Sequence, residues 1–560
     1  MGIIDRKLLV MMLCAPIISW AAGGSESMDR PSMRPLLTPP AKEKITPNFN
    51  LPLLPKSLPH DTQEEKPLFI DRIEFEGNTV IDSLALHEVV KSHEGHYVGM
   101  ADLEEMRLQL SHYYIDHGYL NSGALLDMKN FQKGVLRFTI VEGQVEEVVV
   151  HGQEGLREGY IANRLRVDEG EPLNLQVLQD RFQLLLSDPL ISRMNGRILP
   201  GSSLGKSILD VEVARARPYQ LSFLGNNQRP PSVGSEGFGV NGWVKNLTSL
   251  GETTEFTYYN SAGSNRYSGG ITVPITDQDT QAFFHFDEGD SSVQEQPISK
   301  IHVTSQVHSL EGGLSHPFIN TSKQRFNFGT LIALRENQTY IEGQPFSFTS
   351  GNADGHTQAT VFRAFQDYIQ RWESQAISLR STFSVGIDAL GATIVKNQSN
   401  AQDSEFFSWL GQAQYAYRVD DSGSQFILRG NSQLTNDSLL PLERMAIGGM
   451  GTVRGYRENQ LVRDNGYDVT AEFHYPVLDA ATVAETEIHL NLVPFIDYGS
   501  AWNKNEKEES LFSIGSGFEL DWKQFHSEFY YGYALNAPTQ KQQGDLQDMG
   551  IHFRARVDTF

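Results

Sequence analysis

Residues 218–560 repeat with a period of two, and this pattern constrains the fold more than any other feature. Apolar and aromatic residues alternate with polar or small ones, so each expected strand has one apolar face. Clear examples are 409–417, 467–475 and 512–522. A soluble sandwich also alternates, but here tyrosine and tryptophan are frequent near the strand ends, as at membrane interfaces. The pattern predicts a transmembrane β-barrel.

Composition and charge exclude several classes of partner and site. The chain has 560 residues and a net charge of −23, and we expect no nucleic-acid partner because such a partner needs a basic face. Cys14 is the only cysteine, so neither a disulfide framework nor a cysteine metal site is expected. No run of about 18 apolar residues occurs, and no transmembrane helix is expected. Membrane β-barrels share these features, because their apolar residues alternate with polar ones.

Two segments precede the expected domains. Residues 1–22 have the features of a secretory signal peptide, with Arg6 and Lys7 before an apolar run and small residues at its end. Residues 23–67 contain nine prolines, which remove backbone donors and disfavour helix. We therefore expect an extended, semi-rigid linker there. Whether a helix plugs the barrel stays open, although no clean helical stretch occurs.

Residues 68–143 and 144–217 each predict a small α+β module with the order strand, helix, helix, strand, strand. In the first, apolar residues recur at helical spacing over 103–114, and Gly118 is expected to end that helix. In the second, apolar residues of 175–185 lie on one helical face. Taken alone, this pattern fits any two small α+β domains.

A glycine-rich stretch at Ile447–Asn459 predicts a tight hairpin that carries Arg454. Gly448, Gly449 and Gly451 allow the backbone to turn sharply, because glycine tolerates positive φ. Most such stretches are surface turns in which an arginine is solvated. A phosphate-binding loop is excluded, because no Gly-Lys-Ser/Thr follows.

Two short motifs resemble those of outer-membrane polypeptide-transport barrels. Val-Arg-Gly-Tyr at 453–456 resembles the signature of the loop that folds into the barrel lumen. Phe-Ile-Asp-Tyr-Gly at 495–499 resembles the strand motif Phe-x-Asp-x-Gly that faces this loop. The resemblance implies a lumenal hairpin near 447–459 that is locked by an ion pair between Arg454 and Asp497. The planar guanidinium of an arginine suits such a pair, because its forked donors match the two oxygens of a carboxylate. The other motif residues are Val453, Gly455, Tyr456, Phe495 and Gly499.

The resemblance extends to nearly the whole chain. The two modules resemble polypeptide-transport-associated (POTRA) domains, and the chain resembles the two-partner-secretion outer-membrane transporters (TpsB) of the haemolysin secretion/activation type. It implies periplasmic POTRA domains at 68–143 and 144–217. It also implies a barrel of 16 antiparallel strands over 218–560, a size within the range of outer-membrane barrels, in the outer membrane of a Gram-negative bacterium.

By this resemblance, the function is export of a large partner exoprotein (TpsA-type) that forms a β-helix outside. Folding of the cargo would drive export, started by β-strand addition to a POTRA edge, for which Val135–Val141 and Leu209–Val213 are the candidates. Outer-membrane lipid is a further expected partner, as is the barrel-assembly machinery that recognises an aromatic end such as Phe560. No cofactor is expected. The cargo (adhesin, haemolysin, haem-acquisition protein or contact-dependent toxin) and the oligomeric state stay open.

Three other functions fit the sequence less well. A barrel insertase of the same superfamily usually has more POTRA domains, and a passive porin or adhesin barrel would leave 68–215 without a role. An outer-membrane enzyme needs a catalytic cluster, and no Gly-x-Ser-x-Gly elbow occurs with a plausible triad. His93-Glu94-Gly95-His96 lacks the His-Glu-x-x-His spacing of a zinc site. Neither enzyme activity nor a metal site is expected.

Overall fold

The computed structural model describes residues 49–50, 67–126, 131, 133–166, 170–348, 354–395, 402–478, 488–536 and 544–559. Contacts divide the chain into two compact units, of which one contains Glu43–Arg217 and the other Pro218–Phe560. The expected signal peptide, nearly all of the expected linker, and Phe560 lie outside the described residues. None of the described helices is long and apolar enough to cross a membrane.

The first module of the Glu43–Arg217 unit packs two helices on a three-stranded sheet of order β3-β6-β5. Asp82 caps the first helix by accepting a hydrogen bond from the Leu84 amide at 3.2 Å, and Gly118 follows the second helix with a φ of 90°. The elements are β2 Leu68–Ile70, β3 Arg72–Glu76, α2 Ser83–Val90, η2 Lys91–His93, β4 His96–Val98, α3 Met100–Asp116, β5 Gly123–Leu126 and β6 Val135–Val141.

Glu142 joins both helices of this module to the end of β6. Its carboxylate accepts hydrogen bonds from the amides of Thr79 and Val80, at 2.7 and 3.0 Å, just before α2. The same carboxylate accepts the hydroxyl of Tyr114 in α3 at 3.0 Å. Burial acts to raise the pKa of Glu142, but these hydrogen bonds outweigh burial and lower it below its ordinary 4.5.

We expect Glu142→Gln to destabilise a fragment of residues 43–217 by about 1–3 kcal/mol at pH 7, because an amide accepts these hydrogen bonds more weakly than a carboxylate. The folded-state pKa lies below 4.5. The stabilisation is therefore complete above the unfolded-state value and is lost as pH falls through the folded-state value. Urea unfolding from pH 7 to pH 3 should show the difference from wild type shrinking. Glu88→Gln is the control, because Glu88 forms an exposed pair with Lys91; equal losses for both variants would contradict the expectation.

The second module repeats the architecture with a sheet of order β1-β8-β9-β7. Asn174 caps its longer helix by accepting a hydrogen bond from the Gln176 amide at 2.9 Å. Leu178 and Phe182 of this helix are buried against the sheet. The elements are β1 Phe49–Asn50, β7 Gln144–His151, α4 Ala162–Leu165, α5 Leu175–Leu186, β8 Ile191–Pro200 and β9 Lys206–Arg215.

The two predicted cargo edges are wrong. Val135–Val141 is β6, which pairs with β3 on one side and β5 on the other. Leu209–Val213 belongs to β9, which pairs with both β7 and β8. Both strands are therefore central, and their backbone donors and acceptors are already used by neighbouring strands. Within the described residues the outer strands are β3 and β5 in one sheet and β7 and β1 in the other.

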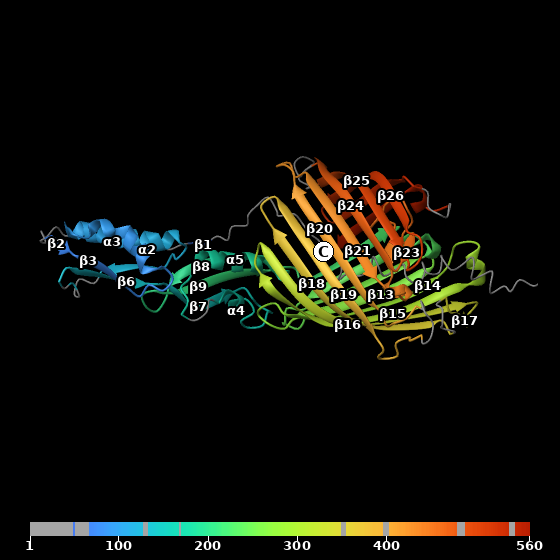
Figure 1. The fold of residues 1–560 in the computed structure, drawn as a ribbon, viewed down its shortest axis with the longest axis horizontal. Coiled ribbons are helices and arrows are strands. Elements are labelled where there is room, and N and C mark those ends of the chain that lie inside the picture. Colours follow the sequence, from blue (N-terminus) through green and yellow to red (C-terminus); the bar gives the residue numbers. More distant parts are fainter. Residues whose placement is uncertain are drawn as a thin grey trace, which may run out of the picture. The chain divides into compact units, whose positions relative to one another are not determined.

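The Pro218–Phe560 unit is a closed antiparallel barrel of 16 long strands, as predicted, with tilted neighbours such as β18–β21 clear in Figure 1. Its seam pairs β10 with β28 from Leu221↔Thr559 to Asn226↔Arg554. The long strands are β10 Tyr219–Asn226, β11 Gly237–Lys245, β12 Thr253–Ser261, β13 Ser264–Pro274, β14 Gln281–Ser292, β15 Val303–Asn320, β16 Gln324–Ile341, β18 His356–Arg371, β19 Gln375–Ile387, β20 Phe407–Arg418, β21 Gln425–Thr435, β24 Asn465–Leu478, β25 Ile488–Trp502, β26 Glu509–Trp522, β27 Phe525–Ala534 and β28 Ile551–Thr559.

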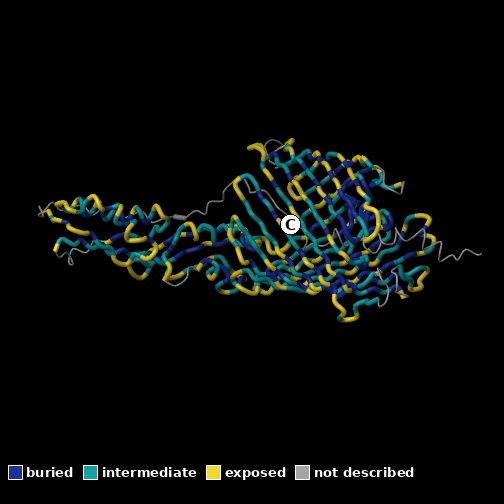
Figure 2. Tube along the Cα trace, in the orientation of Figure 1, coloured by how far each residue is buried: buried dark blue, intermediate teal, exposed yellow. Residues whose placement is uncertain are grey.

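The period-two pattern separates an apolar outer face from a polar inner one. Ile496 and Tyr498 of β25 are exposed, whereas Asp497 between them is fully buried. Figure 2 shows buried and exposed positions interleaved along the barrel strands. Because the exposed positions are mostly apolar and aromatic, this outer surface suits hydrocarbon. The shorter elements of the unit are η4 Pro231–Val233, η5 Ile298–Ile301, β17 Gln344–Pro345, η6 Pro441–Glu443, β22 Met445–Ile447, β23 Leu461–Arg463 and η7 Gln547–Met549.

Candidate functional site in the barrel lumen

The chain leaves the barrel wall between β21 and β24 and forms a hairpin inside it. β22 pairs with β23 in antiparallel fashion, from Met445↔Arg463 to Ile447↔Leu461; we call residues 445–463 the lumenal hairpin. Gly448 and Gly449 have φ values of 115° and 96°, which residues other than glycine rarely adopt. Ile447 and Val453 are fully buried and pack with Ala501 of β25 and Leu511 of β26. The hairpin is therefore part of the barrel interior.

Arg454 and Asp497 form the bidentate pair at the hairpin tip. The Nε and Nη2 atoms of Arg454 donate to Oδ2 and Oδ1 of Asp497 at 2.8 and 2.7 Å, and the Arg454 amide donates to Oδ2 at 3.0 Å. The two side chains are 3% and 0% exposed, so water does not screen the pair. One carboxylate thus fixes both the side chain and the backbone of the tip.

Glu472 of β24 is a second carboxylate on Arg454, and the sequence analysis did not identify it. Its Oε1 lies 2.8 Å from Nη1 of Arg454, and its side chain is 2% exposed. Glu472 also pairs with Arg429 and, at 3.2 Å, with His474. Burial acts to lower the pKa of Arg454, but Asp497 and Glu472 raise it above its ordinary value. Arg454 is therefore a permanently charged group held by two wall carboxylates.

The remaining motif residues surround this pair. The guanidinium carbon of Arg454 lies 3.5 Å from the centre of the Phe495 ring, in a cation–π contact. The Tyr456 hydroxyl lies 2.9 Å from the carbonyl oxygen of Phe512 in β26. A Cβ on Gly499 would lie 2.6 Å from Ile447 and 2.9 Å from Val453. The structure thus brings all seven predicted site residues together, and Gly499 leaves the room in which the hairpin packs.

Gly455 brings the hairpin tip against the last two barrel strands, β27 and β28. Its φ is +88°, and an added Cβ would lie 2.8 Å from the carbonyl oxygen of Gly532 in β27. Its amide donates to Nε2 of His552 in β28 at 3.1 Å. Only glycine fits both the backbone conformation and the space.

We expect Gly455→Ala to displace the hairpin tip and to cost about 2 kcal/mol or more, because strain at positive φ adds to a clash with backbone. Heat-modifiable gel migration should show a lower midpoint temperature for the variant. Gly343→Ala is the matched control, since Gly343 has a φ of +75° with nothing within 4 Å of its Cβ position. If both variants shift the midpoint equally, the close approach to Gly532 has no effect of its own.

Arg457 ties the outgoing limb of the hairpin to two further segments, and the sequence analysis did not predict these contacts. Its Nη2 donates to Asp548 of η7 at 2.8 Å, and its Nη1 donates to Glu295 before η5 at 2.9 Å. The partners lie 91 and 162 residues away in the chain. Nothing in the local sequence could have indicated such distant partners.

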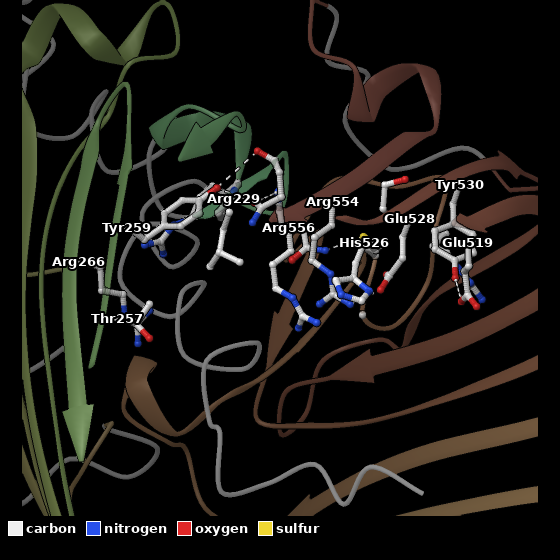
Figure 3. Close-up of a pocket in the computed structure, with 18 of the residues that line it drawn as sticks. Arg229, Thr257, Tyr259, Arg266, Glu519, His526, Glu528, Tyr530, Arg554 and Arg556 are labelled. Atoms are coloured by element: carbon white, nitrogen blue, oxygen red, sulfur yellow. Dashed lines mark hydrogen bonds and ion pairs between the residues drawn. The ribbon is translucent and has the colours of Figure 1, made fainter. Parts of the chain in front are cut away.

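A cavity of about 680 Å³ lies beside the Arg454 pair. Figure 3 shows side chains of β12 and β13, including Tyr259 and Arg266, and side chains of β26–β28 pointing into it. The lining carries both signs of charge, as in Arg554 and Arg556 of β28 and Glu519 and Asp521 of β26. Such a polar, mixed lining suits water and a passing polypeptide more than one small apolar ligand.

The part of the chain that the structure describes contains no candidate metal-binding site. No group of three or more metal-ligating side chains occurs there. His93 lies in η2 and His96 in β4, and Glu94 between them accepts the Ile73 amide at 2.7 Å.

This fold and site define a class: an outer-membrane polypeptide-transport barrel with periplasmic POTRA domains and a hairpin in its lumen. Residues 205–521 match the family model "Haemolysin secretion/activation protein ShlB/FhaC/HecB", and residues 68–143 match the ShlB-type POTRA domain. The first match covers more than half of the chain, and the chain belongs to this family of two-partner-secretion transporters (TpsB).

Relatives with known names support this assignment. The outer membrane transporter CdiB of Dickeya dadantii is 21% identical over 75% of this chain and 73% of its own. The heme/hemopexin transporter protein HuxB of Haemophilus influenzae is 22% identical over 79% and 78%. The structure of CdiB from Escherichia coli superimposes with a TM-score of 0.69 at 18% identity, covering 90% of this chain and 93% of that one. At this identity the superposition shows a shared fold.

Proposed function

We propose that this outer-membrane transporter recognises one large exoprotein in the periplasm and exports it, unfolded, through the barrel lumen. The carrying observation is the buried Arg454–Asp497–Glu472 cluster, which holds a hairpin inside the lumen through charge-assisted hydrogen bonds of 2.7–2.8 Å. A passive pore needs no such lock. A transporter does, because its channel must stay closed until cargo arrives.

The cargo is a TpsA-type protein of large size, which folds into a β-helix outside the cell. The family model, described as a haemolysin secretion/activation protein, and a relative named as a hemolysin transporter protein support a polypeptide cargo. No nucleotide is available in the periplasm, so the free energy of cargo folding outside drives export. An extended cargo segment adds as a strand to an outer POTRA strand; β3, β5 and β7 remain candidates, since β6 and β9 are central.

The outer apolar face contacts outer-membrane lipid, and the barrel-assembly machinery inserts the chain. An insertase role is disfavoured by the family match over residues 205–521. A porin role is disfavoured because it gives no function to the two modules between Leu68 and Arg215.

Co-expression in a Gram-negative host lacking other transporters of this type tests the proposal. The candidate cargo is a large exoprotein of the TpsA type from the same bacterium, fused to an epitope tag. The tag should appear in the medium only when this chain is present, and should stay in the periplasm when the chain is absent. Equal release without the chain would overturn the proposal.

A further inference from the structure

We propose that Glu443 is a second anchor of the lumenal hairpin, separate from Arg454, and that this anchor keeps the channel closed at the root of the hairpin. The inference rests on the proposed function, because it assumes that the hairpin must move when cargo passes. Glu443 ends η6, immediately before Arg444 and the first hairpin strand β22. Its side chain is 3% exposed, and Glu443 belongs to neither of the two motifs at 453–456 and 495–499.

The contacts of Glu443 are as close as those of Arg454. Nη2 of Arg363 donates to both carboxylate oxygens, at 2.8 and 2.7 Å, and Nη1 of Arg335 lies 3.4 Å from Oε1. Nη1 of Arg335 also donates to the carbonyl oxygen of Leu442 at 3.1 Å. Both arginines belong to the barrel wall, in β16 and β18, and their side chains are 3% and 1% exposed. The wall therefore binds the root through a side chain and a backbone group.

The wall itself holds the two arginines in position. Glu311 of β15 lies 2.6 Å from Arg335 and 3.1 Å from Arg363, and Nε of Arg363 donates to the Ser384 hydroxyl at 3.2 Å. Within this cluster, two guanidinium groups thus meet two carboxylates, and only Glu443 comes from the chain segment that enters the lumen. Removal of its charge would leave two buried arginines with one wall carboxylate, which is strongly unfavourable.

The two anchors have opposite polarity and different positions on the wall. At the tip the hairpin supplies the cation, and β24 and β25 supply the carboxylates Glu472 and Asp497. At the root the entering segment supplies the carboxylate Glu443, and β16 and β18 supply the cations. The strands β19, β20 and β21 separate the two wall sectors in the barrel order. Because the clusters share no partner among these contacts, their effects on channel opening should multiply.

Conductance of the purified full-length protein in planar lipid bilayers, without cargo, tests the inference. Glu443→Gln should raise the frequency of channel opening about tenfold or more, because loss of a buried charge partner destabilises the closed state. Glu443→Asp should restore part of the closure. Combined with Asp497→Asn, Glu443→Gln should multiply the increase of the single variants. Asp287→Asn is the matched control, since the Arg266–Asp287 pair joins two wall strands, β13 and β14.

Heat-modifiable migration identifies the variants that are folded and inserted. If Glu443→Gln does not insert, Arg363→Lys replaces it, because lysine keeps the charge but has no second nitrogen with which to contact Glu311 and Glu443 at the same time. The inference is overturned if the inserted variant opens at the wild-type frequency, or if Asp287→Asn opens as often as Glu443→Gln. Failure of the proposed function would appear separately, as absence of cargo export by the wild-type protein.

Discussion

Arg454→Ala and Asp497→Ala are each expected to reduce export at least tenfold while the barrel still inserts. Each variant leaves a fully buried charge without its main partner, which costs about 3–5 kcal/mol. In Asp497→Ala the Arg454 amide also loses its acceptor at 3.0 Å. The hairpin would then lose its defined position in the lumen, and the transporter could no longer couple hairpin movement to the arrival of cargo.

The loss of export in the double variant should be much smaller than the sum of the losses in the two single variants. Removing the second partner also removes the buried charge that the first substitution left without its partner. The two substitutions are therefore coupled, and their effects do not add. Glu472 makes the two single variants unequal. When Asp497 is removed, Arg454 keeps one carboxylate, that of Glu472, at 2.8 Å. Judged by the side-chain contacts, we therefore expect Asp497→Ala to reduce export less than Arg454→Ala does.

Cargo in the medium at matched transporter levels is the measurement for this series. Arg463→Ala serves as the control, because Arg463 pairs with the more exposed Glu509 at 3.0 Å, and such pairs contribute little. If both single variants export normally, or if their defects simply add, Arg454 and Asp497 are not a coupled lock.

Deletion of residues 68–215 should leave an inserted barrel with export at background level. The modules belong to a compact unit with hydrophobic cores of its own, and boundaries between such units tolerate cuts. Heat-modifiable migration should confirm the folded barrel, and cargo should accumulate in the periplasm. Export by the truncated barrel would show that the modules do not recognise cargo.

The sequence predicts the barrel well because one physical pattern, alternation, is local and is repeated in every strand. The contact between Arg454 and Asp497 joins residues that are 43 positions apart in the chain. It was predicted only from the resemblance of the two motifs to those of a known family. Glu472 was not predicted, although alternation places it on the inner face. Its contact with Arg454 depends on the register between β24 and β25, which pairs Thr470 with Asp497 and cannot be read from either strand alone.

Sheet order in the POTRA modules was also beyond local reasoning. The most regularly apolar strands, β6 and β9, were expected at edges, but they are central. Alternation could not have corrected this, because the alternate burial of β6 residues reports which face packs on the core and not which strands lie on either side. The anchor at Glu443 needs partners 80 and 108 residues away on other strands, so that only the folded barrel reveals it.

Passage of cargo through the lumen is the central claim, and site-specific photo-crosslinking to a stalled cargo tests it most directly. The crosslinker replaces Thr257 of β12, which lines the cavity, or its neighbour Phe256, whose side chain is 47% exposed on the outer face. The cargo is stalled by a folded domain fused to its trailing end. We expect cargo adducts at position 257 and none at position 256. Adducts at position 256 alone, or none at position 257 while cargo is stalled across the membrane, would contradict export through the barrel.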